Sequence, residues 1–144
     1  MTAQILPHPD PRPVIPVVDL FAGPGGLGEG FSAYAGQLRF GVTLSIEKQP
    51  AAHRTLELRS FIRQFPRGLI PHEYYAYVRD RVLTRETLFS AYPDQAARAR
   101  SIAWLAELGK KPDQNVFPRI REAIGTARHW VLLGGPPCQA YSVI

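Results

Sequence analysis

The sequence contains little cysteine and no long hydrophobic run. Cys138 is the single cysteine among 144 residues, which excludes an internal disulfide and a metal site built from several cysteines. No apolar segment reaches the roughly 18 residues that a membrane span requires. The N-terminal residues show no basic region followed by an apolar stretch, so they do not resemble a secretory signal. We therefore expect a cytoplasmic protein without a bound metal and without membrane contact.

The composition that remains is that of a globular protein with excess positive charge. Hydrophobic residues make up 45% of the chain and charged residues 20%, a balance typical of one soluble domain. The formal net charge is +5, which favours a polyanionic partner, although many basic proteins bind no nucleic acid. Four prolines precede residue 14, so we expect residues 1–13 to form an extended leader.

Apolar segments and helical patterns then alternate. Residues 14–21 are almost continuously apolar, as in a strand buried on both faces, and Pro16 suggests that the regular strand begins at Val17. A glycine-rich turn leads into a helical pattern. A second strand is expected at 40–46 and a helix at about 50–65, with a proline in its first turn. Two successive strand–helix units predict an α/β fold with a parallel sheet.

The segment at about 66–128 interrupts this alternation, and we expect it to be a helical insertion. Helices are predicted at 96–108 and 118–127. Tyrosines and arginines lie close together at 74–85, which is compatible with a DNA-facing surface, but a packed accessory helix pair is the favoured interpretation. A short apolar strand at 130–133 follows. The rest of the chain, 14–144, is treated as one domain.

The segment Gly23-Pro24-Gly25-Gly26-Leu27-Gly28 fits the pattern G-x-G-x-x-G. Glycines allow a sharp turn and a close approach of the backbone to a ligand. The pattern alone also fits a turn without a ligand, or a dehydrogenase in which Glu47 binds a ribose. Asp19, just before the turn, would crowd a pyrophosphate but could pair with a cationic or amine-bearing ligand, while Phe21 offers a flat surface for a base. A nucleoside with an amino-acid tail, such as S-adenosylmethionine, therefore fits better than a diphosphate.

Cys138 follows two glycines and two prolines at the end of the last predicted strand. Pro136 and Pro137 cannot extend a helix or donate to a sheet, so they stiffen the loop. Open α/β sheets carry their chemistry at the carboxyl ends of the strands. A thiol held there can act as a nucleophile if its thiolate is stabilised, and this interpretation is favoured over a cysteine that only packs.

Together these segments resemble the DNA cytosine-5 methyltransferases. Residues 19–27, DLFAGPGGL, followed by Gly30-Phe31, resemble the first motif of that family, and residues 134–142, GGPPCQAYS, resemble its catalytic motif. Ser45-Ile46-Glu47 is similar to the acidic motif at the end of the second strand. The resemblance covers most of the chain, although the middle segment matches the family only loosely. It implies an incomplete Rossmann-like, S-adenosylmethionine-dependent methyltransferase fold with helices on both faces of the sheet, the first strand lying between the other two.

The resemblance also implies roles for individual residues. The cofactor would contact Asp19, Phe21, Gly23, Gly25, Gly26 and Leu27. Glu47 would accept hydrogen bonds from its ribose. Cys138 would attack carbon-6 of a cytosine flipped out of DNA, making carbon-5 nucleophilic. Pro137 would line the cytosine pocket, and Gln139 and Ser142 would hold the loop or the DNA backbone.

Some features of the family are not found. For the aspartate that contacts the adenine amino group, the candidates are Asp80 and Asp113. The Glu-Asn-Val motif, the arginine-rich motif and the target-recognition region do not occur before Ile144. We therefore expect the polypeptide to be inactive alone and to pair with a complementing chain. A tRNA-directed member of the superfamily and a non-catalytic cofactor-binding or partner module stay as alternatives, and neither the recognition site nor the biological role follows from the sequence.

Overall fold

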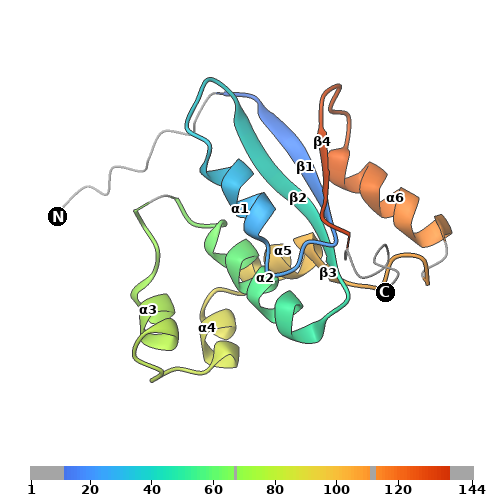
Figure 1. Ribbon diagram of the computed structural model, residues 1–144. Helices are drawn as coiled ribbons and strands as arrows, with labels where there is room; N and C mark the ends of the chain where they lie inside the picture. The colour runs from blue at the N-terminus through green and yellow to red at the C-terminus, as the bar shows by residue number, and fades with distance from the viewer. Residues whose placement is uncertain (1–11, 67, 111–112, 137–144) are drawn as a thin grey trace, which may run out of the picture.

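The computed structural model of the chain describes residues 12–66, 68–110 and 113–136 (Figure 1). The strands are β1 (Val14–Leu20), β2 (Arg39–Glu47), β3 (Ala103–Leu105) and β4 (Val131–Gly134). The helices are α1 (Gly26–Ala33), α2 (Pro50–Ile62), α3 (His72–Val78), α4 (Arg85–Ala91), α5 (Pro93–Ile102) and α6 (Asp113–Ile124). The strands form one sheet in the order β3-β2-β1-β4, and every neighbouring pair is parallel. The predicted α/β class is confirmed, as is the place of the first strand between the second and the last.

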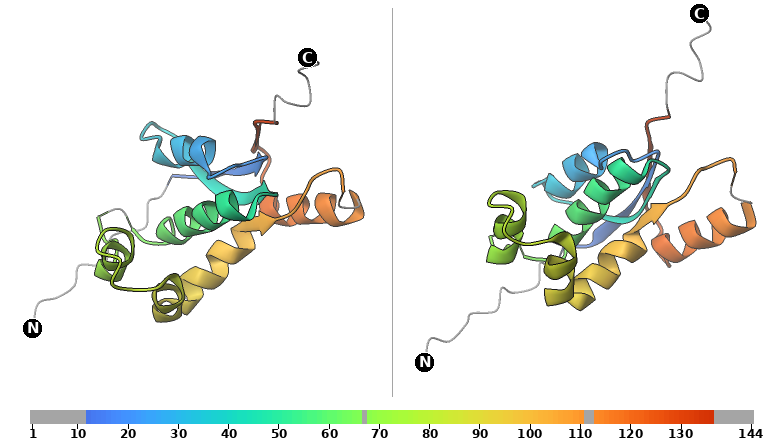
Figure 2. Two further views of the ribbon diagram at one scale, coloured as in Figure 1. Left: turned by 60° about the horizontal axis from the view of Figure 1, so that its bottom comes forward. Right: turned by 90° about the horizontal axis from the view of Figure 1, so that it is seen from below.

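Helices cover both faces of the sheet, in the manner of a Rossmann-like fold (Figures 1 and 2). On one face lie α1 and α2, and Leu56 of α2 packs with Ala22 and Ala103. On the other face lies α6, which packs against the buried side chains of Val18 and Leu44. Successive strand side chains point to opposite faces, so the almost continuous apolar run of β1 serves both layers.

β1 begins at Val14, three residues before the predicted start of the regular strand. Pro16 is accommodated because β4 pairs with β1 only from Val17 onward, whereas β2 pairs with it from Val14. At the position of the proline the strand therefore has a neighbour on one side only, which is where a missing backbone donor is tolerated. The predicted start at Val17 was wrong for this reason.

The helix predicted at 96–108 is confirmed as far as Ile102, but its predicted continuation to residue 108 was wrong. α5 ends at Ile102 and the next three residues form β3, in register with Ser45, Ile46 and Glu47 of β2. The open edge of β2 provides backbone partners that local helical spacing does not reveal. The last helix begins at Asp113 rather than at 118 and contains Pro118. That proline lies inside α6, at the sixth of its twelve residues, where it removes one backbone hydrogen bond of the helix.

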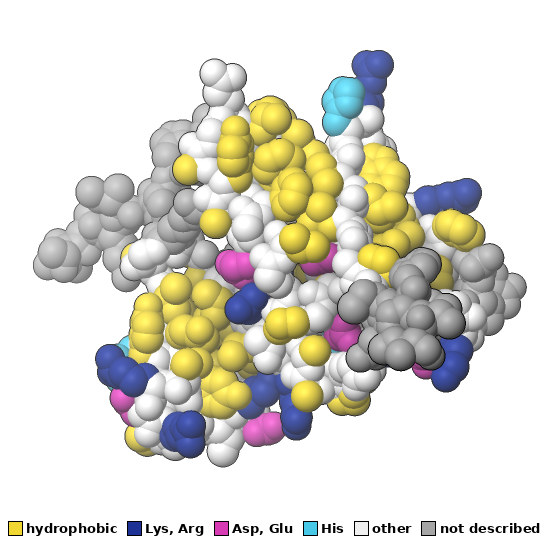
Figure 3. Space-filling view, in the orientation of Figure 1, with side chains coloured by type: hydrophobic (Ala, Val, Ile, Leu, Met, Phe, Trp, Pro, Cys, Tyr) yellow, Lys and Arg dark blue, Asp and Glu magenta, His cyan; other side chains and the backbone are white. Residues whose placement is uncertain are grey.

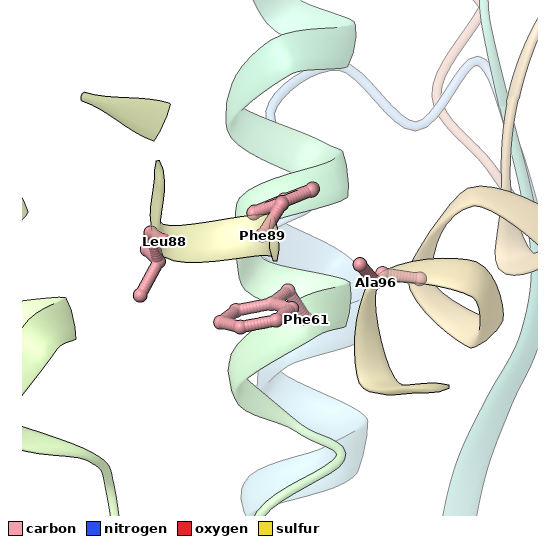
Figure 4. Close-up of a cluster of buried hydrophobic side chains, with 5 residues drawn as sticks. Phe61, Leu88, Phe89 and Ala96 are labelled. Carbon is pink, nitrogen blue, oxygen red and sulfur yellow. The ribbon is translucent and has the colours of Figure 1, made fainter. Parts of the chain in front are cut away.

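A second core joins α2 to the helices of the middle segment. Its buried members are Phe61, Leu88, Phe89, Ala96 and Ala99, and Figure 4 shows Leu88, Phe89 and Ala96 gathered around Phe61. The rings of Phe61 and Phe89 stack with centroids 4.6 Å apart. Glu57, buried on α2, pairs with Arg85 and with Arg100. These contacts fasten α4 and α5 to α2. None of the helices in the described ranges is long and apolar enough to cross a membrane.

The edge of the sheet formed by β4 has no strand beyond it in the part of the chain that the structure describes. Leu132 of β4 is 53% exposed and the preceding Trp130 is 40% exposed. Apolar side chains beside a free strand edge are a surface on which further chain can pack.

Candidate functional site

The turn between β1 and α1 has an unusual backbone. Gly23 and Gly25 have φ angles of 57° and 90°, and Phe21 has a φ of 56°. A glycine adopts this left-handed region without penalty, whereas a phenylalanine there is strained. A Cβ atom on Gly25 would also lie 2.8 Å from the Leu56 side chain of α2. Position 25 therefore requires glycine both for its conformation and for the close approach of α2.

Glu47, at the end of β2, holds this turn. Its Oε2 accepts a hydrogen bond from the Gly23 amide at 2.8 Å, and its Oε1 accepts one from the Gln49 amide at 2.7 Å. The Ala22 amide donates to the Ile46 carbonyl at 3.0 Å. The structure thus brings the predicted acidic residue onto the predicted glycine turn. Each carboxylate oxygen keeps a second lone pair, so Glu47 can still accept a bond from a ligand hydroxyl.

Asp19 lies beneath the first turn of α1 and has no exposed surface. Its Oδ2 is 3.3 Å from the position of a Cβ atom on Gly28. Neither carboxylate oxygen has a hydrogen-bond partner of ordinary geometry among the described residues, and the same holds for the Ser45 hydroxyl, its neighbour on β2. Burial raises the pKa of Asp19, opposed by the nearby Gly28 amide and by the positive charge of Arg63. Buried polar groups left in this way call for a functional explanation.

The solvent side of the turn is apolar. Phe21 is 39% exposed and Leu27 is 54% exposed. From Leu27 an apolar groove of about 570 Å³ continues along α1 to the start of β2. It is lined by Gly26, Leu27, Gly30, Phe31, Tyr34, Leu38 and Phe40. Figure 3 shows the hydrophobic side chains gathered over α1 and β2. Rings and aliphatic groups at the turn can therefore contact a base, as was predicted for Phe21.

The end of β4 lies beside the turn. In the register of the sheet, Leu20 is opposite Gly134, and Asp19 is opposite Leu133. The two strands therefore end level with each other, and the chain leaves both at the same edge. Of the predicted loop residues, Pro137, Cys138, Gln139 and Ser142 lie outside the described residues.

An acidic residue that sequence reasoning missed follows β3. Glu107 comes two residues after the end of that strand and pairs with Lys110 at 3.0 Å and Lys48 at 3.6 Å. These charges lower the pKa of Glu107. Recognising residues 103–105 as a strand would have identified it. Asp80 and Asp113 were the candidates for the aspartate that contacts the adenine amino group. Asp80 is paired with Arg79 at 2.8 Å in the segment after α3. The side chain of Asp113 lies outside the described residues.

Comparison with known proteins adds one relative. No family model matches the chain, and no solved structure matches it. The chain is similar to the Type II methyltransferase M.Bpa9945I of Bacillus paralicheniformis, with 26% identity over 144 residues. The match covers 89% of this chain and 32% of the relative. The chain therefore spans about a third of the length of the curated relative that it matches.

Proposed function

We propose that this chain is the cofactor-binding and nucleophile-bearing part of a DNA cytosine-5 methyltransferase. The observation that carries the proposal is the register of Leu20 with Gly134. It brings the turn that resembles the first family motif and the strand leading to Cys138 to the same edge of the sheet. The similarity to a type II methyltransferase supports methyl transfer.

S-adenosylmethionine is the cofactor that the residues fit. The glycine turn gives backbone access, Phe21 and Leu27 offer apolar surface, and Glu47 retains acceptor capacity for ribose hydroxyls. The unpartnered carboxylate of Asp19 supplies negative charge for a cationic or amine-bearing ligand. Glu107, after β3, takes the place proposed for the carboxylate near the adenine amino group. When bound, the cofactor supplies a methyl group on a sulfonium.

Cys138 is the proposed nucleophile. Its thiolate adds to carbon-6 of a cytosine extruded from DNA, because a stacked base is out of reach. The addition forms a carbon–sulfur bond and makes carbon-5 nucleophilic. Carbon-5 takes the methyl group of the bound cofactor, whose sulfur–methyl bond is broken. Loss of the carbon-5 proton then restores the ring double bond, breaks the carbon–sulfur bond and releases the thiolate. Pro137 lines the base pocket in this scheme, and Gln139 and Ser142 hold the loop or the DNA backbone.

The motifs that the family carries after the catalytic cysteine are absent from these 144 residues. Because the match covers 32% of the relative, we propose that further polypeptide, in the same chain or in a separate one, supplies these motifs. The exposed apolar residues beside the edge of β4 suit such an association. The 144-residue chain alone is then expected to transfer no methyl group to duplex DNA when incubated with labelled S-adenosylmethionine.

Calorimetric titration of the folded chain with S-adenosylmethionine tests the proposal. We expect saturable binding that is weakened by Glu47→Ala, while Glu122→Ala on the exposed surface of α6 serves as the matched control. A pure interaction module need not bind the cofactor. A folded chain that shows no binding at millimolar S-adenosylmethionine would overturn the proposed function.

A further inference from the structure

Arg63, at the end of α2, joins two helices of the site. Its Nη1 donates to Glu29 Oε2 of α1 at 3.0 Å, and its Nη2 donates to the buried Ser60 Oγ of α2 at 3.1 Å. The Arg63 side chain is only 16% exposed. A guanidinium has a rigid fork of donors that can hold two acceptors at once. The side chain thus joins α2 to the first turn of α1, with the Arg63 end of the contact largely buried and the Glu29 side chain 47% exposed.

The first turn of α1, to which Arg63 is hydrogen-bonded, lies against Asp19. Glu29 directly follows Gly28, and the backbone of Gly28 lies against the Asp19 carboxylate. Among the described residues, Arg63 is the charged group that lowers the pKa of Asp19. Asp19 in turn raises the pKa of Arg63, against a larger lowering of that pKa by burial. Arg63 therefore interacts electrostatically with Asp19 and is hydrogen-bonded to Glu29.

Among the residues that the structure describes, the remaining groups around Asp19 do not provide another counter-charge. In the sheet register its neighbours are Ser45 on β2 and Leu133 on β4. From α1 it meets the Gly28 amide, and the other cation of α2 in this region is Arg59, whose positive charge lowers the pKa of Arg63. A buried carboxylate without a nearby cation would be strongly disfavoured in its charged form.

We propose that Arg63 is a positioning residue of the candidate site: it ties α2 to the first turn of α1, the turn whose Gly28 backbone lies against the buried Asp19, and its positive charge acts on that carboxylate. The glycine turn lies between β1 and α1. The hydrogen bond from Arg63 to Glu29 restrains the turn at its α1 end, and Glu47 restrains it at Gly23. Arg63 thereby acts through Asp19 and α1 without touching the ligand. Its importance for the cofactor rests on the proposed function, whereas its action on Asp19 does not.

The action on Asp19 is tested without any ligand. The carboxyl carbon of Asp19 is followed by NMR through a pH titration of the whole chain carrying labelled aspartate. We expect a higher titration midpoint in Arg63→Met than in the native chain and a nearly native midpoint in Arg63→Lys, which keeps the charge. Arg54→Met removes an exposed cation from the same helix and is expected to leave the midpoint unchanged.

The effect on the site is tested with S-adenosylmethionine. Arg63→Met removes the positive charge that acts on Asp19. We therefore expect this variant to bind S-adenosylmethionine roughly tenfold more weakly than the native chain at pH 7. Arg63→Lys is expected to be intermediate, because an ammonium cannot hold Glu29 and Ser60 with two planar donors. The affinity of Arg63→Met is also expected to begin its decline at a higher pH than that of the native chain as the solution is acidified.

The outcomes separate the two proposals. An unchanged Asp19 midpoint in folded Arg63→Met would overturn the inference, as would equal loss of affinity in Arg54→Met. If Arg63→Met does not fold, Arg63→Lys decides. Native affinity contradicts the role of the two hydrogen bonds, and a clearly shifted Asp19 midpoint contradicts the action of the charge. A native chain that binds no S-adenosylmethionine refutes the proposed function, while the Asp19 titration still shows whether Arg63 acts on it.

Discussion

The Gly23 amide donates a 2.8 Å hydrogen bond to the Glu47 carboxylate across 24 positions of sequence. This bond connects the turn after β1 with the end of β2, and the second oxygen of the same carboxylate accepts from the Gln49 amide at the start of α2. One buried side chain therefore sets the positions of two connections that lead from the sheet into its helices.

Replacement of Glu47 tests this role. In Glu47→Ala both amides lose a charged acceptor, and hydrogen bonds to charged groups are worth about 1.5–3 kcal/mol each. We expect the free energy of unfolding to fall by roughly 2–4 kcal/mol, measured by urea denaturation. Glu47→Gln, which keeps the size and one acceptor oxygen, should lose less. Equal stability of Glu47→Ala and the native chain would contradict the role of the turn bond.

Replacement of Gly25 separates backbone strain from steric contact. Both Gly25 and Gly109 have positive φ, 90° and 86°, but a Cβ atom meets the Leu56 side chain only at position 25. We therefore expect Gly109→Ala to lower the free energy of unfolding by about 1 kcal/mol through backbone strain alone. Gly25→Ala should lower it clearly more. Thermal unfolding of the two variants gives the comparison. If both lose the same stability, the close approach of α2 does not constrain the turn.

Phe21 combines a strained backbone with an exposed ring. A glycine relieves a left-handed φ, so Phe21→Gly should be about 1 kcal/mol more stable than Phe21→Ala. Both variants lack the ring and should bind S-adenosylmethionine more weakly than the native chain. Denaturation and calorimetry on the same samples measure the two effects. Native affinity in the folded alanine variant would remove Phe21 from the proposed site.

The buried Asp19 predicts a dependence of stability on pH. Because burial raises its pKa above the ordinary value of 3.8, the unfolded chain releases the proton at lower pH than the folded chain. Asp19 therefore makes the fold less stable as the pH rises through this interval, and more stable as the pH falls through it. Asp19→Asn carries no such charge and should be about 1 kcal/mol more stable than the native chain at pH 7.

The advantage of Asp19→Asn should shrink as the pH approaches 3.8 and vanish below it, which a series of urea denaturations would show. Asp94→Asn, at the exposed start of α5, controls for the loss of a surface charge. An advantage of Asp19→Asn that is constant with pH would contradict an ionised Asp19 in the folded chain.

Local sequence was sufficient where a feature depends on neighbouring residues. The apolar run of β1, the glycine turn and the proline at the start of α2 occupy their predicted places because backbone preferences and side-chain periodicity act over a few residues. The same reasoning placed Asp19, Phe21 and the glycines on one connection, and Glu47 at the end of the next strand.

Tertiary structure alone decided the features that depend on distant partners. Residues 103–105 form a strand because the edge of β2 offers them hydrogen-bond partners, and Pro16 fits into β1 because β4 begins one residue later. The burial of Asp19 and the bridge from Arg63 to Glu29 arise from the packing of α1 and α2 on the sheet. Long-range pairing and burial depend on which segments meet in space, and no pattern confined to one stretch of sequence contains that information.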